Sequence, residues 1–282
     1  MSHIESILNE KVISSSSVGG GCIADSRKIT TESGREFFLK SMNPGNHIFH
    51  CEANGLKELD KAQALRVPSV VATTDDFLLL EYISQGVRTN DFFEKFGQKL
   101  ARLHRFRAGY FGFFEDNYIG ATSQLNIPDA REAQDWTAFY FNKRLLFQYK
   151  LVERNGFASP RLKNGFMKLE SSIDSILKGS EEQPCLLHGD LWGGNYLCDE
   201  NGEAVLIDPA VYYGHREADL AMTRLFGGFP VAFYESYHCE YPLPADWKYR
   251  ENIYKLYHVM NHLNLFGTGY LQEAEQLLNF YT

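Results

Sequence analysis

Hydrophobic and polar positions follow two different rhythms along this chain. Up to about residue 83, apolar residues come in brief runs separated by polar turns, which favours short strands around one helix. That helix is predicted over 50–64, where Ala53, Leu56 and Leu59 fall on one face. The predicted strands cover 11–18, 22–31, 37–40, 68–73 and 77–83, with a turn at 32–35.

Beyond residue 84 the apolar positions recur at helical spacing. Phe92, Phe96 and Leu100 follow one another at steps of four residues, which predicts a helix that buries their common face. Further helices are predicted over 129–155, 159–179 and 245–278, the last with a break near 267–269. The chain is therefore predicted to be an α+β protein with a small β-rich lobe at 1–83 and a larger, mainly helical lobe at 84–282. The active site is expected in the cleft between them.

The strongest chemical signal is a His-Gly-Asp stretch followed by a hairpin and an Ile-Asp-Pro stretch. Asp190 and Asn195 stand five positions apart, as in a kinase catalytic loop, where the aspartate accepts a hydroxyl proton and the asparagine holds Mg²⁺. Asp208 ends the apolar run 204–207 and offers a second oxygen ligand for Mg²⁺. Asn201-Gly202 predicts a tight hairpin between these groups. The alternative is two ordinary turns rich in Asp, Gly and Pro, but the order, the spacing and the intervening hairpin favour the catalytic loop.

Together with other segments, these motifs resemble the fructosamine kinase (ketosamine-3-kinase) family over nearly the whole chain. This family belongs to the protein-kinase-like fold that aminoglycoside and choline phosphotransferases share. Trp192 and the segments at 226–229 and 261–267 distinguish the family from phosphotransferases in general. The segments that carry the resemblance are HGDLWGGN at 188–195, IDPA at 207–210, YGHREADLAM at 213–222, FGGF at 226–229, FGF at 111–113, DNYIG at 116–120, YH at 257–258 and NHLNLFG at 261–267.

The resemblance implies ATP- and Mg²⁺-dependent phosphorylation of a sugar hydroxyl, the 3-hydroxyl, of ketosamines such as ribulosamines or fructosamines. Since the new phosphate makes the sugar–amine adduct labile, the implied role is deglycation of proteins or small amines. Two alternatives remain. An aminoglycoside- or choline-type kinase needs an acidic or aromatic cage for a cation. A nucleotide-binding pseudokinase should have lost a catalytic group, whereas Lys40, Asp190, Asn195 and Asp208 are all present.

The nucleotide half of the cleft is predicted from a glycine loop and a strand lysine. Gly19-Gly20-Gly21 lies between two predicted strands and resembles the family's glycine loop, in which backbone N–H groups approach phosphate oxygens. Lys40 ends a short apolar strand, where a kinase lysine holds the α- and β-phosphates. Glu52 is favoured as its ion-pair partner over Glu58, which lies further along the same predicted helix.

The connector between the lobes is the expected adenine site. Glu81, Tyr82 and Ile83 lead out of the small lobe. In kinase-like folds the main chain of this segment pairs with adenine, so the three side chains themselves carry little information. An ordinary buried strand would have the same sequence pattern.

Four residues near the catalytic loop have both a functional and a structural interpretation. Trp192 is either a wall for the sugar or its amine substituent or a core tryptophan, and the resemblance favours substrate contact. His262 resembles a residue that faces the acceptor pocket, against the alternative of a satisfied core histidine. His188 is expected to hydrogen-bond the loop backbone. Asp219 resembles the aspartate that braces the loop from the start of a helix.

Composition and charge limit the partners and the cellular compartment that are expected for the protein. The net charge of −8 argues against nucleic-acid and anionic-membrane partners. No apolar run approaches the ~20 residues that span a bilayer, and no signal peptide is recognised at the N-terminus. Five cysteines without paired spacing favour a reducing compartment, so a cytoplasmic protein is expected. Cys22 is either a free thiol of no consequence or an oxidisable group able to form an intermolecular disulfide, which leaves the oligomeric state open.

Overall fold

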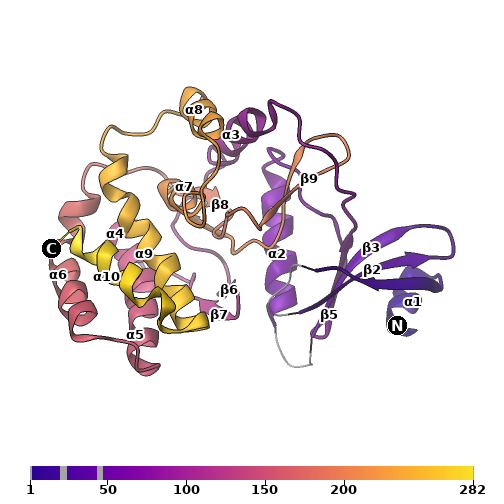
Figure 1. Ribbon diagram of the computed structural model, residues 1–282, viewed down its shortest axis with the longest axis horizontal. Coiled ribbons are helices and arrows are strands. Elements are labelled where there is room, and N and C mark those ends of the chain that lie inside the picture. The colour runs from indigo at the N-terminus through magenta and orange to yellow at the C-terminus, as the bar shows by residue number, and fades with distance from the viewer. Residues whose placement is uncertain (1, 20–23, 43–46, 282) are drawn as a thin grey trace.

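The computed structural model describes residues 2–19, 24–42 and 47–281. The amino-terminal part is built on a five-stranded antiparallel sheet in the order β1-β2-β3-β5-β4 (Figure 1). Its elements are α1 (Ser2–Leu8), β1 (Val12–Ser17), β2 (Asp25–Thr31), β3 (Glu36–Ser41), α2 (Ile48–Lys61), β4 (Val70–Thr73) and β5 (Phe77–Glu81).

The strand β5 is apolar on both faces because a helix covers each of them. Side chains alternate across a strand, so Leu78 and Leu80 pack into the cluster that contains α2, whereas Phe77 and Leu79 pack into the cluster that contains α1. The sequence predicted α2 but not α1. The continuous apolar run of β5 therefore reflects a helix on the second face as well.

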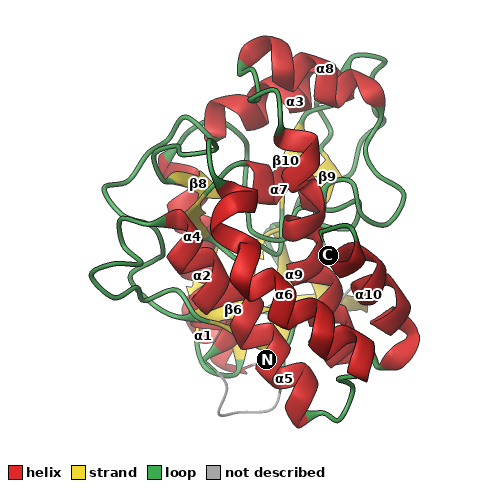
Figure 2. Cartoon of the chain, turned by 90° about the vertical axis from the view of Figure 1, so that its left-hand side faces the viewer, coloured by secondary structure: helices red, strands yellow, loops and turns green. Residues whose placement is uncertain are grey.

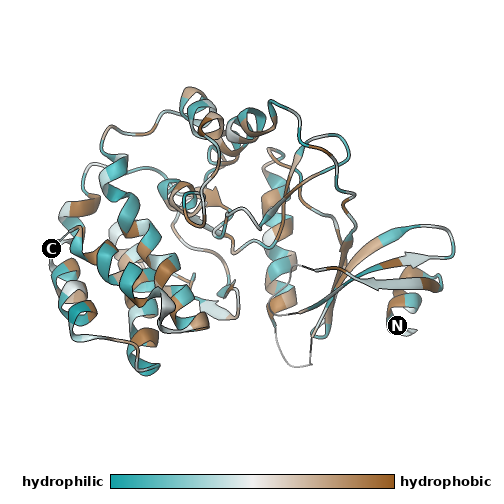
Figure 3. Cartoon of the chain, viewed as in Figure 1, coloured by the Kyte–Doolittle hydropathy of each residue, from teal (hydrophilic) through white to brown (hydrophobic). Residues whose placement is uncertain are grey.

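The rest of the chain is mainly helical, and its helices lie at the other end of the molecule from the sheet (Figure 1), so that they stand in front of the sheet in Figure 2. Hydrophobic and hydrophilic segments alternate along these helices (Figure 3), as expected when one side of each helix packs on a core. The helices are α3 (Phe92–Leu103), α4 (Trp136–Tyr140), a π-helical segment (Phe141–Leu146), α5 (Phe147–Arg154), α6 (Pro160–Leu177), α7 (Glu217–Met222), α8 (Val231–Glu240), α9 (Trp247–Phe266), a 3₁₀ turn (Thr268–Tyr270) and α10 (Leu271–Asn279).

Six short strands form three antiparallel pairs within this part, two of which are hairpins. The strands are β6 (Asn117–Ile119), β7 (Thr122–Gln124), β8 (Cys185–Leu187), β9 (Tyr196–Cys198), β10 (Ala204–Leu206) and β11 (Tyr212–Gly214). They pair as β6 with β7, β9 with β10, and β8 with β11. The β9–β10 pair is the hairpin predicted from Asn201-Gly202. The predicted α+β architecture is confirmed, as is the contrast between a β-rich and a mainly helical part.

The helix predicted over 129–155 begins later than expected, at Trp136. The side chain of Asp135 accepts a hydrogen bond from the Ala138 N–H, as an N-cap does, so the helix begins there. Asp129 instead accepts bonds from the N–H groups of Arg131 and Glu132 in a separate turn. The helix predicted from 159 is confirmed as α6, and Ser159 caps it by accepting a bond from the Leu162 N–H. The break near 267 is confirmed too, because α9 ends at Gly267 with φ +88°.

The two parts of the chain are tied together along the β9–β10 hairpin. The N–H of Leu206 donates to the carbonyl of Arg66 over 2.9 Å, and just past the small lobe the N–H of Gly86 donates to the carbonyl of Cys198 over 2.9 Å. The Arg66 side chain also binds both Asp199 of the hairpin and Glu81 at the end of β5. These contacts hold the hairpin against the small lobe. No helix in the described part of the chain is both long and apolar enough to cross a membrane.

Candidate active site

The predicted catalytic loop leaves strand β8 and returns into strand β9. Within it, the Asn195 side-chain amide donates to the Asp190 carbonyl over 2.7 Å and to Asp190 Oδ2 over 2.9 Å. Burial raises the pKa of Asp190 well above its ordinary value; the carboxylates of Asp208 and Asp219 push it the same way, against the bond from Asn195. The five-residue spacing thus closes the loop on itself and turns the Asn195 amide nitrogen toward Asp190. Among the described residues, none donates a hydrogen bond to the amide oxygen of Asn195, which leaves it as a potential ligand.

Asp219 braces this loop from the first turn of α7. Its carboxylate accepts the N–H of His188 over 2.7 Å and the N–H of Gly189 over 2.8 Å, and it lies 3.2 Å from His104 Nε2. Burial alone would raise the pKa of Asp219, but the histidine and the backbone bonds hold it below its ordinary value. Gly189 has φ +84°, and a Cβ there would meet the Ala210 carbonyl oxygen at 2.0 Å. A glycine is therefore needed for this close approach.

His188 has a structural place. Its ring Nε2 lies 2.9 Å from the Ile207 carbonyl and its Nδ1 accepts the Asp190 N–H over 3.2 Å. These bonds assign the proton to Nε2 and join the loop to the end of β10. Burial lowers the pKa of His188, which keeps the imidazole neutral.

His104 was missed by the sequence analysis. It follows the last residue of α3, is fully buried, and links Asp219 to the hydroxyl of Tyr237, 2.8 Å from its Nδ1. A single histidine at a helix end carries no motif. Its partner Asp219 lies 115 positions away, so no local spacing could have revealed it.

Lys40 binds two carboxylates, one from each lobe. Its Nζ lies 2.6 Å from Glu52 Oε1 on α2 and 2.6 Å from Asp208 Oδ1 after β10. The predicted pairing of Lys40 with Glu52 is confirmed. Glu58, the alternative partner, instead binds Lys61 and the hydroxyl of Tyr213. Burial would lower the pKa of Lys40, but the two carboxylates raise it, so the ammonium stays charged.

Asp208 adopts an uncommon backbone conformation, with φ +53°. Aspartate is one of the few non-glycine residues that occupy this region readily. The residue before it closes the hairpin through the bond from the Ile207 N–H to the Asn195 carbonyl, 3.1 Å long. Asn195 and Asp208 therefore sit at the two ends of the β9–β10 hairpin. Their amide and carboxylate oxygens are the hard donors that fit Mg²⁺.

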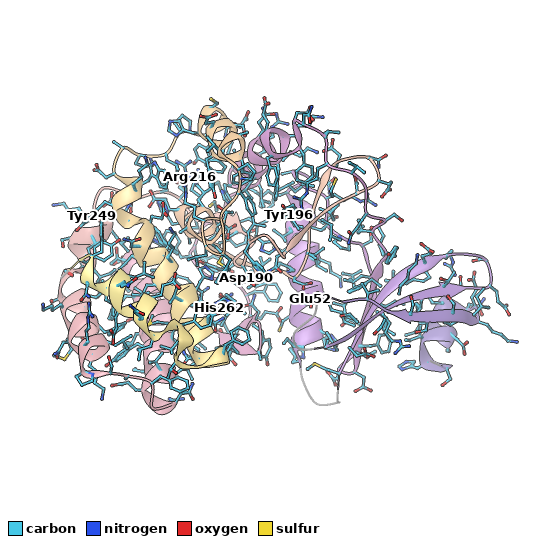
Figure 4. The ribbon with its side chains drawn as sticks, in the orientation of Figure 1. Glu52, Asp190, Tyr196, Arg216, Tyr249 and His262 are labelled. Atoms are coloured by element: carbon cyan, nitrogen blue, oxygen red, sulfur yellow. The ribbon has the colours of Figure 1, made fainter. Side chains whose placement is uncertain are left out.

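A cavity of about 580 Å³ lies between the lobes and is lined by most of the predicted site residues. Its volume is in the range of small-molecule sites. Figure 4 shows where Glu52 lies at α2 and where Asp190 and His262 lie in the neighbouring large lobe. The predicted site residues that line the cavity are Gly19, Lys40, Glu52, Glu81, Tyr82, Ile83, Asp190, Trp192, Asn195, Asp208 and His262. Gly20, Gly21 and Cys22 lie outside the described residues. His188 and Asp219 lie behind the loop.

The side chains of the connector between the lobes contact neighbouring residues of the protein. The Glu81 carboxylate accepts from Arg66 over 2.6 Å and from the Ser69 N–H over 3.1 Å. The Tyr82 ring lies 4.3 Å below the Lys28 ammonium. Ile83 is buried. The side chains of Glu81 and Tyr82 are thus engaged within the small lobe.

Trp192 is not a core residue. Its side chain is 37 % exposed, and its ring meets Phe226 edge-on at 5.8 Å between centroids. His262 is half-buried on α9 and its Nδ1 lies 2.8 Å from the His258 carbonyl. The Phe226 ring, 4.8 Å from His262, joins the two predicted acceptor residues into one aromatic wall, which Phe266 extends. Phe226 was part of the resemblance, but no sequence pattern indicated its contact with both residues.

Comparison with known proteins agrees with this geometry. The model of the fructosamine kinase family matches residues 2–281. The chain is 37 % identical over 279 residues to the chloroplastic protein-ribulosamine 3-kinase of Oryza sativa subsp. indica, covering 96 % of this chain and 79 % of the relative. It is 38 % identical over 276 residues to a protein of Enterococcus faecium named probable ketoamine kinase, covering 96 % and 95 %.

Solved structures give the same assignment. A candidate fructosamine-3-kinase from Thermobifida fusca superposes with a TM-score of 0.90 at 29 % identity, covering 99 % of this chain and 97 % of that one. A macrolide 2′-phosphotransferase, at 15 % identity, superposes with a TM-score of 0.62 over 98 % and 96 %, which supports the protein-kinase-like fold alone. The predicted fold class and family resemblance are confirmed. The chain belongs to the fructosamine kinase family and is a kinase.

Proposed function

We propose that this kinase transfers phosphate from ATP, with Mg²⁺, to the 3-hydroxyl of ketosamines such as ribulosamines or fructosamines. One observation carries the proposal: Asp190 and the aromatic wall of Trp192 and His262 line the same cavity as the Lys40–Asp208 pair. A group that accepts a proton, a surface for a sugar and a site for phosphate charge therefore share one space. The product would be a labile adduct, so the biological outcome would be deglycation.

Asp190 is the proposed general base. Its carboxylate is oriented by Asn195, and burial raises its pKa, which makes it a stronger proton acceptor than an ordinary aspartate. The Asp219 brace would keep the loop in place while the proton moves to Asp190 Oδ1 or Oδ2. His188, held neutral between two backbone groups, would take no proton in this step.

Phosphate charge is assigned to Lys40 and to the hairpin ends. Lys40, positioned by Glu52, would neutralise the α- and β-phosphates. Asn195 and Asp208 would hold Mg²⁺, which, when bound, neutralises charge on the transferring phosphate. Gly19-Gly20-Gly21 would cover the phosphates, and the main chain of 81–83 would hold adenine. In this proposal residues 1–83 form the nucleotide-binding lobe and 84–282 the catalytic and acceptor-binding lobe.

A substrate panel with purified protein tests the assignment. ATP and Mg²⁺ would be supplied with a ribulosamine, a fructosamine, choline or an aminoglycoside, and ADP release would be followed together with phosphorus NMR of the product. The proposal expects turnover on the ketosamines and a 3-phosphate signal. The aromatic wall could also hold a quaternary ammonium, so turnover on choline with none on ketosamines would reject the acceptor class. ATP binding without turnover on any acceptor would indicate a pseudokinase.

A further inference from the structure

A second group of side chains with metal-binding chemistry lies at the amino end of α2. The ligand atoms of His47, Cys51 and Glu115 all lie within 4.8 Å of one another. Those of His47, His50 and Asp75 form a second set of the same size, which shares His47. Neither set includes any residue that the proposed reaction uses.

The first set joins the two lobes. His47 and Cys51 are one helical turn apart, His47 at the N-cap of α2 and Cys51 inside it. Glu115 comes from the loop before β6, in the large lobe. The second set, by contrast, comes from the small lobe alone.

Two of the three side chains of the first set are already oriented. The Asn54 amide donates to Glu115 Oε1 over 2.9 Å, which leaves Oε2 for another partner. The Cys51 thiol, which is 4 % exposed, points to the Asp116 carbonyl at 3.6 Å. His47 is exposed, so its ring is the one that can move toward the other two. Around a Zn²⁺ ion, tetrahedral ligand atoms lie ~3.3–3.8 Å apart for the usual bond lengths, and an adjustment of the His47 ring would bring the set to that spacing.

The electrostatic surroundings of the set attract a cation. Burial, together with the carboxylates of Glu115 and Asp116, raises the pKa of the Cys51 thiol to about 12. The two carboxylates raise this pKa because they create a negative electrostatic potential at the sulfur. A thiol, an imidazole and one carboxylate are ligands for Zn²⁺ and its neighbours in the transition series, whereas Mg²⁺ prefers oxygen ligands alone.

We propose that His47, Cys51 and Glu115 form a binding site for Zn²⁺ or a chemically similar transition-metal ion, with water as the fourth ligand. On binding, the Cys51 thiol gives its proton to solvent and coordinates as the thiolate. Because Glu115 belongs to the large lobe, the bound ion connects the two lobes at the mouth of the cleft. Cys51 itself lines the active-site cavity and precedes Glu52, the partner of Lys40. Occupancy would therefore restrain the helix that positions the catalytic lysine.

Cobalt serves as the spectroscopic probe. Co²⁺ would be titrated into the full-length protein in the presence of a large excess of Mg²⁺, which occupies hard-oxygen sites such as Asp208. We expect one equivalent to bind with a thiolate-to-cobalt charge-transfer band in the near ultraviolet. The band should be absent in Cys51→Ser and present in Cys239→Ser, a matched control for an exposed cysteine of α8. A band that persists in Cys51→Ser would overturn the proposal.

Two further variants test the other ligands by affinity. Zn²⁺ affinity would be measured by competition with a chromophoric chelator. His47→Ala, at an exposed position that does not threaten the fold, should weaken Zn²⁺ binding at least tenfold. Glu115→Gln should do the same. Zn²⁺ should raise the melting temperature of the wild type and much less that of Glu115→Gln. His50→Ala should bind as the wild type does. Unchanged affinity in His47→Ala or Glu115→Gln, or loss of binding in His50→Ala alone, would reject this three-ligand site.

Discussion

Replacing Asp190 by asparagine should remove nearly all phosphotransfer and, at neutral pH, make the fold more stable. The two effects have one cause. Burial raises the pKa of Asp190, so the ionised carboxylate is less favourable in the folded protein than in the unfolded chain. Asparagine has no charge to bury. Its side-chain oxygen can still accept the bond from Asn195, which now joins that nitrogen to Asp190 Oδ2 over 2.9 Å, so the loop should keep its shape.

The size of the activity loss follows from the role of the group. A general base contributes about 10²–10⁴-fold, which corresponds to a rise of about 2.7–5.5 kcal/mol in the activation barrier. The sign of the stability change follows from linkage. Above the ordinary aspartate pKa of about 3.9, the carboxyl is ionised in the unfolded chain, and the folded protein bears the free-energy cost of burying this charge. Below that pH the carboxyl is protonated in both states, so the cost disappears. The stability gain of Asp190→Asn should therefore be largest at neutral pH and shrink toward pH 4.

Single-turnover kinetics and urea unfolding measure the two effects on the same preparation. Mg-ATP affinity, followed by calorimetry, should stay close to that of the wild type. Asp174→Asn on α6, an exposed aspartate that does not line the cavity, is the matched control and should change neither rate nor stability. If Asp190→Asn keeps more than about a tenth of the single-turnover rate, well outside the range for a lost base, the assignment of Asp190 is wrong. A variant less stable than the wild type at pH 7 would contradict the electrostatic argument.

Three other substitutions test separate parts of the site. Asp208→Ala should abolish Mg²⁺-dependent ATP binding in calorimetry, because it removes the carboxylate that Lys40 holds at 2.6 Å; unchanged affinity would rule out the metal role. Trp192→Ala should lower kcat/KM for the ketosamine by a factor equivalent to about 1–3 kcal/mol of lost apolar contact while leaving the ATP Kd unchanged. Since the ring is 37 % exposed, a large fall in melting temperature would contradict this. Asp219→Ala should cost about 2–6 kcal/mol of unfolding free energy in urea titrations, because it leaves the two buried N–H groups of the catalytic loop unpaired at about 1–3 kcal/mol each; a neutral substitution would show that the brace is dispensable.

The parts of the site that could be predicted are those set by local chain geometry. The loop from Asp190 to Asn195 closes through a bond between residues five apart, and the hairpin that follows is specified by its Asn-Gly turn. The Lys40–Glu52 pair spans twelve positions, but a strand followed by a helix brings its two members together in a standard way. In each case, the sequence interval itself limits where the side chains can go.

The contacts that could not be predicted join segments far apart in the chain. Lys40 reaches Asp208 across 168 positions, and His104 reaches Asp219 across 115. Neither spacing carries information, because the first contact depends on how the two lobes dock and the second on tertiary packing within the large lobe. The same limit applies to α1: seven mostly polar residues form a weak pattern, and only the apolar second face of β5 requires a helix there.

The double attachment of Lys40 has a consequence for how the cleft works. One ammonium holds a carboxylate of α2 and the carboxylate at the end of the β9–β10 hairpin, so the two lobes meet at the charged centre of the site. Away from that centre, Arg66 joins the same hairpin to the end of β5. The hairpin is therefore attached to the small lobe at two points, one of which uses a catalytic residue and one of which does not. Because Asn195 and Asp208 sit at the hairpin ends, any relative movement of the lobes must either carry these oxygens with the small lobe or break the bonds of Lys40.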